Sequence, residues 1–155
     1  MTTPKCYQLV GVPGSGKSTW VAHQEWADKC AYISTDKWVD DYARDMGKTY
    51  NEVFKEYMPE AIDMMINDVV KARGMDKDII WDQTSTTVKS RKKKFNMLLD
   101  YEHIAVVFRT PESEELAKRL ASRPGKNIPD YVVRTMIDGF EMPTLAEGFI
   151  EIIHV

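Results

Sequence analysis

A single glycine-rich loop constrains this chain more than any other feature of its sequence. Residues 11–18 read Gly-Val-Pro-Gly-Ser-Gly-Lys-Ser and match the pattern G-x-x-x-x-G-K-[ST] at every fixed position. The loop follows a mostly apolar segment, residues 5–10, that predicts a strand, and it precedes residues 17–29, which lack Gly and Pro and predict a helix. In this context backbone N–H groups can cradle phosphate oxygens. The sequence therefore predicts a phosphate-binding loop at residues 11–18.

The residue types in this loop suit a nucleoside triphosphate and its metal ion. The glycines let the backbone turn inward, the Lys17 ammonium can reach the β- and γ-phosphates, and the Ser18 hydroxyl can ligate Mg²⁺. We therefore expect ATP and Mg²⁺ as cofactors. The residues expected to bind the nucleotide are Gly11, Pro13, Gly14, Ser15, Gly16, Lys17, Ser18 and Thr19.

The remaining sequence alternates short apolar segments with amphipathic ones. Strands are predicted at residues 31–34, 78–81, 104–108 and 149–155, with helical spacing between them. This alternation favours an α/β fold of the P-loop NTPase type, a parallel sheet with helices on both faces. Pro59 should break or kink the helix that contains it, or start a second one. A basic helix around Lys89 to Lys94 should bury Phe95, Leu98 and Leu99.

Length and composition narrow the class of protein. The 155 residues suit one domain, 1–155, with no room for a second catalytic unit. The formal net charge of −3 argues against a protein that coats nucleic acid by charge alone. Two cysteines without metal-ligand spacing indicate neither a disulfide framework nor a zinc site. Because no apolar run suits a signal peptide or a membrane span, we expect a cytoplasmic protein without membrane contact.

Two carboxylates follow predicted strands, where a doubly wound sheet places its crevice. Asp36 could accept a proton from an attacking hydroxyl, or it could simply cap the helix that follows. Asp82 could hold Mg²⁺ through water or orient a substrate hydroxyl, or it could start a turn. Position alone leaves each pair of interpretations open.

Basic and aromatic residues give further candidates. Arg119 and Arg123 flank a Pro-Gly segment and could form a short lid, at about residues 119–127, that closes on ATP, or they could be a solvated helix end. The basic helix could contact a phosphate backbone, although such charge runs usually face solvent. Trp38, Tyr42 and Tyr50 could stack on a base or belong to the core.

Several of these segments together resemble the 5′-hydroxyl polynucleotide kinase domain of bacteriophage and animal DNA and RNA end-repair enzymes. The segments that carry the resemblance are the loop from Gly11 to Trp20, Thr35-Asp36, Asp82-Gln83-Thr84, the lid from Lys118 to Gly125, Ile128-Pro129 and the tail from Phe140 to Phe149. The similarity spans nearly the whole chain, and a lone kinase domain of this size is similar to phage relatives. The phosphatase domain of many relatives is not expected here.

The resemblance implies a role for each matching position. Asp36 stands where the family has the general base, Arg123 matches the lid arginine that engages ATP phosphates, and Arg119 is its neighbour. Asp82 and Thr84 match the motif beside the acceptor site, where Lys37 could assist. The family's acceptor side differs here at three positions: Thr35 replaces an arginine before the base, Val39 replaces an arginine that holds the substrate phosphate, and Ser85 replaces an asparagine.

We therefore expect a kinase that moves the γ-phosphate of ATP to a hydroxyl, most simply the 5′-hydroxyl end of DNA or RNA, with no protein partner evident. A kinase for a hydroxymethylated base in DNA or for a small metabolite is the first alternative, because every departure lies on the acceptor side. A module that hydrolyses ATP without transfer is the second.

Overall fold

Five parallel strands form one sheet in the order β2-β3-β1-β4-β5. This arrangement comes from a computed structural model that describes residues 2–155. The strands are β1 (Lys5–Val10), β2 (Ala31–Ile33), β3 (Ile79–Trp81), β4 (Glu102–Val107) and β5 (Glu151–His154). The predicted parallel α/β fold is confirmed, and its five strands lie within two residues of the expected segments.

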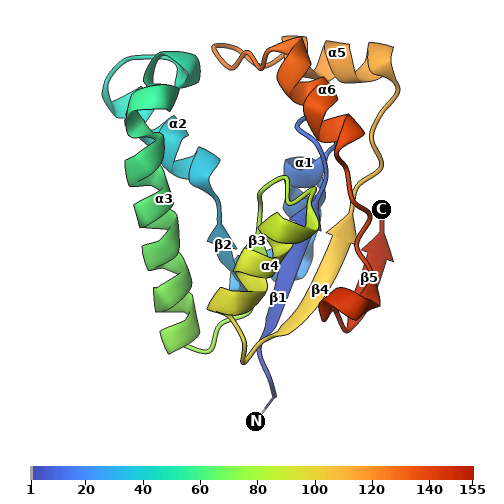
Figure 1. Cartoon of the computed structure of the whole chain (residues 1–155). Helices are drawn as coiled ribbons and strands as arrows, with labels where there is room; N and C mark the ends of the chain where they lie inside the picture. Colours follow the sequence, from blue (N-terminus) through green and yellow to red (C-terminus); the bar gives the residue numbers. More distant parts are fainter. Residues whose placement is uncertain (1) are drawn as a thin grey trace.

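Helices cover both faces of the sheet (Figure 1). They are α1 (Lys17–Ala22), α2 (Thr35–Asp45), α3 (Tyr50–Gly74), α4 (Val88–Met97), α5 (Ser113–Ala121) and α6 (Asp130–Asp138), with short 3₁₀ helices η1 (Glu25–Lys29) and η2 (Leu145–Glu147). Helices α5 and α6 lie above the tips of the strands, and α2 and α3 stand at the β2 edge (Figure 1). No helix within residues 2–155 is both long and apolar enough to cross a membrane.

The alternation of side chains along the strands explains the two-sided core. Cys6 on β1 and Trp81 on β3 face a layer made by α3 and the end of α4. Leu9 and Ile80 face the opposite layer, which α1 and η1 supply. Because both faces are buried, the strands are apolar on both sides, as a covered parallel sheet requires.

Polar caps set where the longer helices begin. The Ser34 hydroxyl accepts a hydrogen bond from the Lys37 N–H at 3.3 Å and so caps α2. Thr49 and Glu52 form a capping box at the start of α3. Both caps lie at the carboxyl-end edge of the sheet, so they fix how α2 and α3 approach the strand tips.

Two helix predictions need correction. The helix expected over residues 17–29 ends at Ala22, and η1 continues the segment. Of the alternatives expected at Pro59, a break and the start of a second helix do not occur, because α3 is one helix from Tyr50 to Gly74. Pro59 and Lys55, whose carbonyl loses its intrahelical partner, both face solvent, where water can take the place of that hydrogen bond.

The basic helix also differs from its prediction. Leu98 is fully buried, but Leu99 is 78 % exposed. Arg91 and Lys94, expected on a solvated face, are buried instead. The helix lies over the sheet with these two cations on its inner side, and only Lys92 and Lys93 among its central basic residues face solvent.

Candidate active site

One large cleft, with a volume of about 1800 Å³, opens at the carboxyl ends of the strands. Residues that follow β1, β2, β3 and β4 line it together with α5, the loop after α5 and the start of α3. The predicted site residues that line the cleft are Pro13, Gly14, Ser15, Gly16, Lys17, Ser18, Thr19, Asp36, Lys37, Asp82, Thr84, Arg119 and Arg123. The fold thus brings together nearly all of them from five separate segments.

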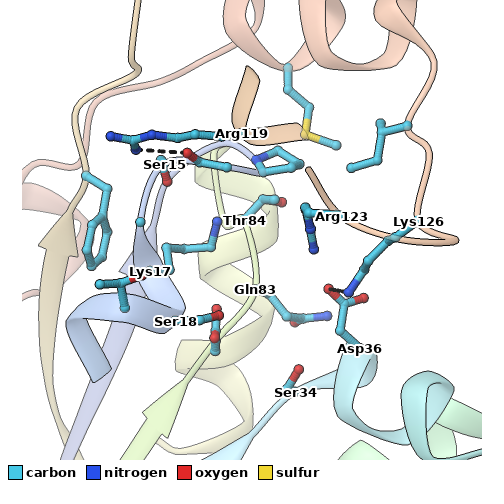
Figure 2. A pocket seen from close by; sticks show the side chains of 18 of the residues that line it. Ser15, Lys17, Ser18, Ser34, Asp36, Gln83, Thr84, Arg119, Arg123 and Lys126 are labelled. Carbon is cyan, nitrogen blue, oxygen red and sulfur yellow. Dashed lines mark hydrogen bonds and ion pairs between the residues drawn. The ribbon is translucent and has the colours of Figure 1, made fainter. Parts of the chain in front are cut away.

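Figure 2 shows how the cleft divides. Lys17, Ser18 and Arg119 lie on what we call the glycine-loop side, and Asp36 and Lys126 lie on what we call the α2 side. Gln83, Thr84 and Arg123 lie between the two sides.

The glycines of the loop have two different functions in its geometry. Gly14 and Gly16 have φ values of 81° and 101°, a conformation that other residues rarely adopt. Gly11 does not line the cleft: a Cβ there would come within 2.5 Å of the Ser15 Oγ and 2.9 Å of the Phe108 Cβ. Gly11 is therefore required for close packing beneath the loop, whereas Gly14 and Gly16 turn the loop around the cleft.

The Lys17 ammonium is held inside the loop. Its Nζ donates hydrogen bonds to the Gly11 and Val12 carbonyls at 2.9 and 3.0 Å. An ammonium has three N–H donors, so one remains for a ligand in the cleft. Burial lowers the pKa of Lys17 to about 8, while the charges of Asp82 and Asp36 act in the opposite direction.

Asp82 lies at the carboxyl end of β3, as predicted, and Tyr32 donates a hydrogen bond to its Oδ2. Burial raises the pKa of the Asp82 carboxyl, against the lowering effects of that hydrogen bond and of the Lys17 charge. Ser18 is exposed to the cleft at the start of α1. Residues 2–155 contain no cluster of three metal-ligating His, Cys, Asp or Glu side chains. A Mg²⁺ ion, which accepts one carboxylate, phosphates and water, would fit Ser18 and Asp82.

Asp36, in the first turn of α2, is held at both carboxylate oxygens. The Tyr50 hydroxyl donates to its Oδ1 at 2.6 Å, and the Lys126 Nζ lies 3.5 Å from its Oδ2. Lys126 also lies 3.7 Å from the Asp40 carboxylate and 4.2 Å from the centre of the Tyr50 ring. Burial is the main cause that raises the pKa of Tyr50, and its bond to Asp36 adds to it. The carboxylate therefore faces the cleft in a fixed orientation.

The sequence analysis assigned no contact with Asp36 to Lys126 or Tyr50, and it did not predict Tyr32, which bonds Asp82. Lys126 falls inside the expected lid at about residues 119–127 but has no role of its own in that prediction, and the sequence predicts Tyr50 only as a base-stacking or core residue. A signal for Tyr50 was present, because the capping pair Thr49 and Glu52 places it in the first turn of α3. Trp38 and Tyr42 pack against the core cluster between α2 and α3, as Tyr50 also does through its ring.

The segment after α5 reaches across the cleft and is fastened to α3. Asn51 and Asn127 exchange two hydrogen bonds of 2.8 Å between side chain and backbone, and the Asn51 N–H donates to the Gly125 carbonyl at 3.0 Å. Gly125 has a φ of 67°, and a Cβ there would come within 2.7 Å of the Thr49 Cβ. This close contact holds the segment over the α2 side.

The two arginines predicted for the lid differ in their contacts. Arg119 pairs with Glu115 at 3.0 Å, and its Nη1 donates to the Gly14 carbonyl at 3.1 Å. Arg123 also lines the cleft, but none of the ion pairs within residues 2–155 includes it. Arg119 is thus attached to the glycine loop, whereas the Arg123 guanidinium is available to a ligand between the two sides.

The residues that depart from the kinase pattern have structural explanations. Val39 is completely buried between α2 and α3, so its side chain cannot meet a ligand. The buried Thr35 hydroxyl accepts a hydrogen bond from the Gln83 Nε2 at 3.4 Å. The cation that contacts Asp36 therefore comes from Lys126, and Lys37 is the basic side chain that α2 itself adds to the cleft.

Comparison with known proteins supports this interpretation of the fold and the loop. A family model described as an AAA domain matches residues 8–143. The chain is 27 % identical over 152 residues to the bifunctional polynucleotide phosphatase/kinase of Schizosaccharomyces pombe, an alignment that covers 95 % of this chain and 32 % of that protein. The chain thus spans about a third of the length of this curated relative. The resemblance inferred from the sequence is confirmed.

Solved structures share the whole architecture. A putative kinase from Chloroflexus aurantiacus matches with a TM-score of 0.75 and 17 % identity, over 99 % of this chain and 88 % of that one. A chain of the Pnkp1/Rnl/Hen1 RNA repair complex matches with a TM-score of 0.68 and 23 % identity, over 90 % of this chain and 44 % of that one. These similarities establish the P-loop kinase fold.

Proposed function

Because the chain belongs to the AAA-domain family and has the fold of P-loop kinases, we propose that it transfers the γ-phosphate of ATP to the 5′-hydroxyl of a polynucleotide. One observation carries the proposal. The Asp36 carboxylate, oriented by Tyr50 and Lys126, lies in the same cleft as the loop that holds Lys17. A base on one side and a phosphate-binding loop on the other are what transfer to an alcohol requires.

The glycine-loop side would bind the triphosphate. Loop N–H groups and the free N–H of Lys17 would contact the β- and γ-phosphates, with Arg119 beside the loop. Arg123 would neutralise charge on the transferring group. A Mg²⁺ ion held by Ser18, with Asp82 nearby, would supply charge neutralisation between the phosphates when bound.

The α2 side would bind the acceptor. Asp36 would take the proton from the acceptor hydroxyl as its oxygen bonds to the γ-phosphorus and ADP leaves. Two fixed contacts keep the carboxylate from rotating away, so its geometry is set before the substrate arrives. Asp82 and Thr84 line the space between the two sides, where they could orient the hydroxyl, while Lys37 extends the rim.

Two observations support a nucleic-acid acceptor. The curated relative is named a polynucleotide phosphatase/kinase, and Lys126 offers a cation beside Asp36, where a phosphate next to the reacting hydroxyl would lie. With a net charge of −3, the chain would hold only a few nucleotides near the cleft.

A different acceptor is the second candidate, and Val39 favours it. Because the side chain at that position is apolar and buried, α2 offers no cation there for a substrate phosphate, and Lys37 is its one basic side chain that lines the cleft. A hydroxymethylated base within DNA or a small hydroxyl-bearing metabolite would need less charge at this point than a strand end needs.

A transfer assay with γ-labelled ATP and Mg²⁺ tests the proposal. The acceptors are a short single strand with a 5′-hydroxyl and the same strand with a 5′-phosphate, each as DNA and as RNA. Label on the hydroxyl strand alone is the expected result. Label on neither strand, with ADP still formed, would overturn the polynucleotide acceptor.

A further inference from the structure

The loop that joins β3 to α4, residues 82–87, is fixed through its backbone from three directions. Three consecutive carbonyls each accept a hydrogen bond from a different element: the glycine loop, α4 and the segment after α6. The pairs are Gly11 N to Thr84 O at 2.9 Å, Arg91 Nη1 to Ser85 O at 2.9 Å and Glu141 N to Thr86 O at 2.8 Å. The loop therefore has little freedom to move on its own.

The central contact comes from a buried ion pair. Arg91 is fully buried, and its Nε and Nη2 bond the two carboxylate oxygens of Glu147 at 2.8 and 3.2 Å. The remaining nitrogen, Nη1, reaches Ser85. A planar guanidinium can make all three contacts at once, and a lysine ammonium cannot. Since a buried ion pair often stabilises no better than apolar side chains of similar volume, stability alone does not account for this arrangement.

The ion pair bonds the backbone of Ser85, which has an unusual conformation. Its φ of 47° lies in the left-handed region, which a residue other than Gly rarely adopts. Its hydroxyl is buried and has no hydrogen-bond partner within residues 2–155, so its own side chain does not support this conformation. Such a backbone persists when its surroundings determine it, and Arg91 is the group that bonds its carbonyl.

The fixed loop reaches the α2 side through Gln83. The Trp81 Nε1 donates to the Gln83 Oε1 at 3.0 Å, and the Gln83 Nε2 donates to the Thr35 hydroxyl at 3.4 Å. Thr35 directly precedes Asp36. A continuous series of contacts therefore runs from the buried ion pair through the loop to the first turn of α2.

We propose that the Arg91–Glu147 pair positions the acceptor side of the active site by holding residues 82–87. This rests on the proposed function for the identity of the acceptor. Neither residue lines the cleft, so both act through the loop and are positioning residues. Loss of the pair should impair use of the acceptor more than the binding of ATP, because Lys17 and the glycine loop keep their own contacts.

A double variant separates positioning from stability. Arg91→Met with Glu147→Met replaces both charges with apolar side chains, so we expect the fold to be retained. It removes the bond to Ser85 and, with Glu147, the bond from the Thr144 N–H at 3.0 Å. We expect a melting temperature close to that of the wild type and a decrease of about 10- to 100-fold in kcat/KM for the 5′-hydroxyl strand. The KM for ATP should change by less than about twofold. Arg91→Lys, which keeps the charge but not the fork, should show the same pattern.

His103→Phe is the matched control. It removes two buried hydrogen bonds, to Gln8 and to the Leu98 carbonyl, at the opposite end of the sheet, so it should lower stability without a selective loss of acceptor use. Acceptor kinetics of the double variant equal to those of the wild type would overturn the proposal.

Amide hydrogen exchange keeps this test independent of the acceptor. The Gly11 and Glu141 amides, which donate into the loop, should exchange faster in the double variant and not in His103→Phe. If the wild type labels no 5′-hydroxyl strand, the proposed function fails. The exchange result alone then tests whether the Arg91–Glu147 pair holds residues 82–87 in place. Unchanged exchange at both amides would overturn the proposal that the pair holds this loop.

Discussion

The two sides of the cleft are built in different ways. The glycine-loop side is built mainly from the contiguous residues 13–19, to which α5 adds Arg119, and Leu116 on α5 packs against it at Gly14. The α2 side is assembled from side chains on separate elements: Asp36 on α2, Tyr50 on α3 and Lys126 on the segment after α5. Most residues of the glycine-loop side are therefore neighbours in the sequence, whereas the residues of the α2 side come together only when the chain folds. Changes of acceptor are easier to accommodate on the second side.

The sharpest test of the glycine-loop side is Lys17→Ala. Because the partly buried Lys17 ammonium bonds the loop backbone directly, we expect both transfer and ATP hydrolysis to fall by about 10³-fold or more. Steady-state assays of both reactions measure this, with circular dichroism to check the fold. Wild-type hydrolysis in this variant would show that the loop does not hold the triphosphate.

Arg123→Ala probes the space between the two sides. Its guanidinium has no ion-pair partner in the described part of the chain, so removing it should lower kcat for transfer by about 10²-fold with little loss of stability. Rapid-quench measurement of a single turnover isolates this step. An equal effect of Arg44→Ala, on the exposed end of α2, would contradict a local role.

Lys126→Met tests the α2 side alone. The variant removes the cation beside Asp36, so the KM for the 5′-hydroxyl strand should rise by about tenfold, while the KM for ATP stays the same. Lys55→Met, an exposed lysine on α3 outside the cleft, is the matched control. A rise in both KM values would mean that the two sides are not independent.

The smallest expected effect is a pH dependence confined to the glycine-loop side. Burial lowers the pKa of Lys17 to about 8, so raising the pH through this value removes the charge that attracts phosphate. In the free enzyme, kcat/KM for ATP should fall about fourfold between pH 7 and 8.5. Burial also lowers the pKa of Lys94 to about 8, but Lys94 lies outside the cleft, so Lys94→Met should retain the profile. A flat profile in the wild type would contradict the assignment to Lys17.

The sequence predicted those features that are determined by residues close together along the chain. The strands, the glycine loop and the position of Asp36 and Asp82 at strand ends follow from short segments, because apolar runs and turn residues determine them. It did not predict that Arg91 and Lys94 face inward, because a basic helix has the same pattern whether its cations meet solvent or a buried carboxylate such as Glu147, 56 residues away. The Lys126–Asp36 pair was missed for the same reason, since its partners meet only when the segment after α5 docks on α3.

The central claim is that Asp36 activates an acceptor hydroxyl while the glycine loop binds ATP independently. We would measure transfer to a 5′-hydroxyl strand and ATP hydrolysis without acceptor in the wild type, in Asp36→Asn and in Asp40→Asn, whose carboxylate also meets Lys126. Loss of transfer by about 10²- to 10⁴-fold in Asp36→Asn alone, with unchanged KM for ATP, is the predicted result. Unchanged transfer in Asp36→Asn, or equal losses in both variants, would contradict the claim.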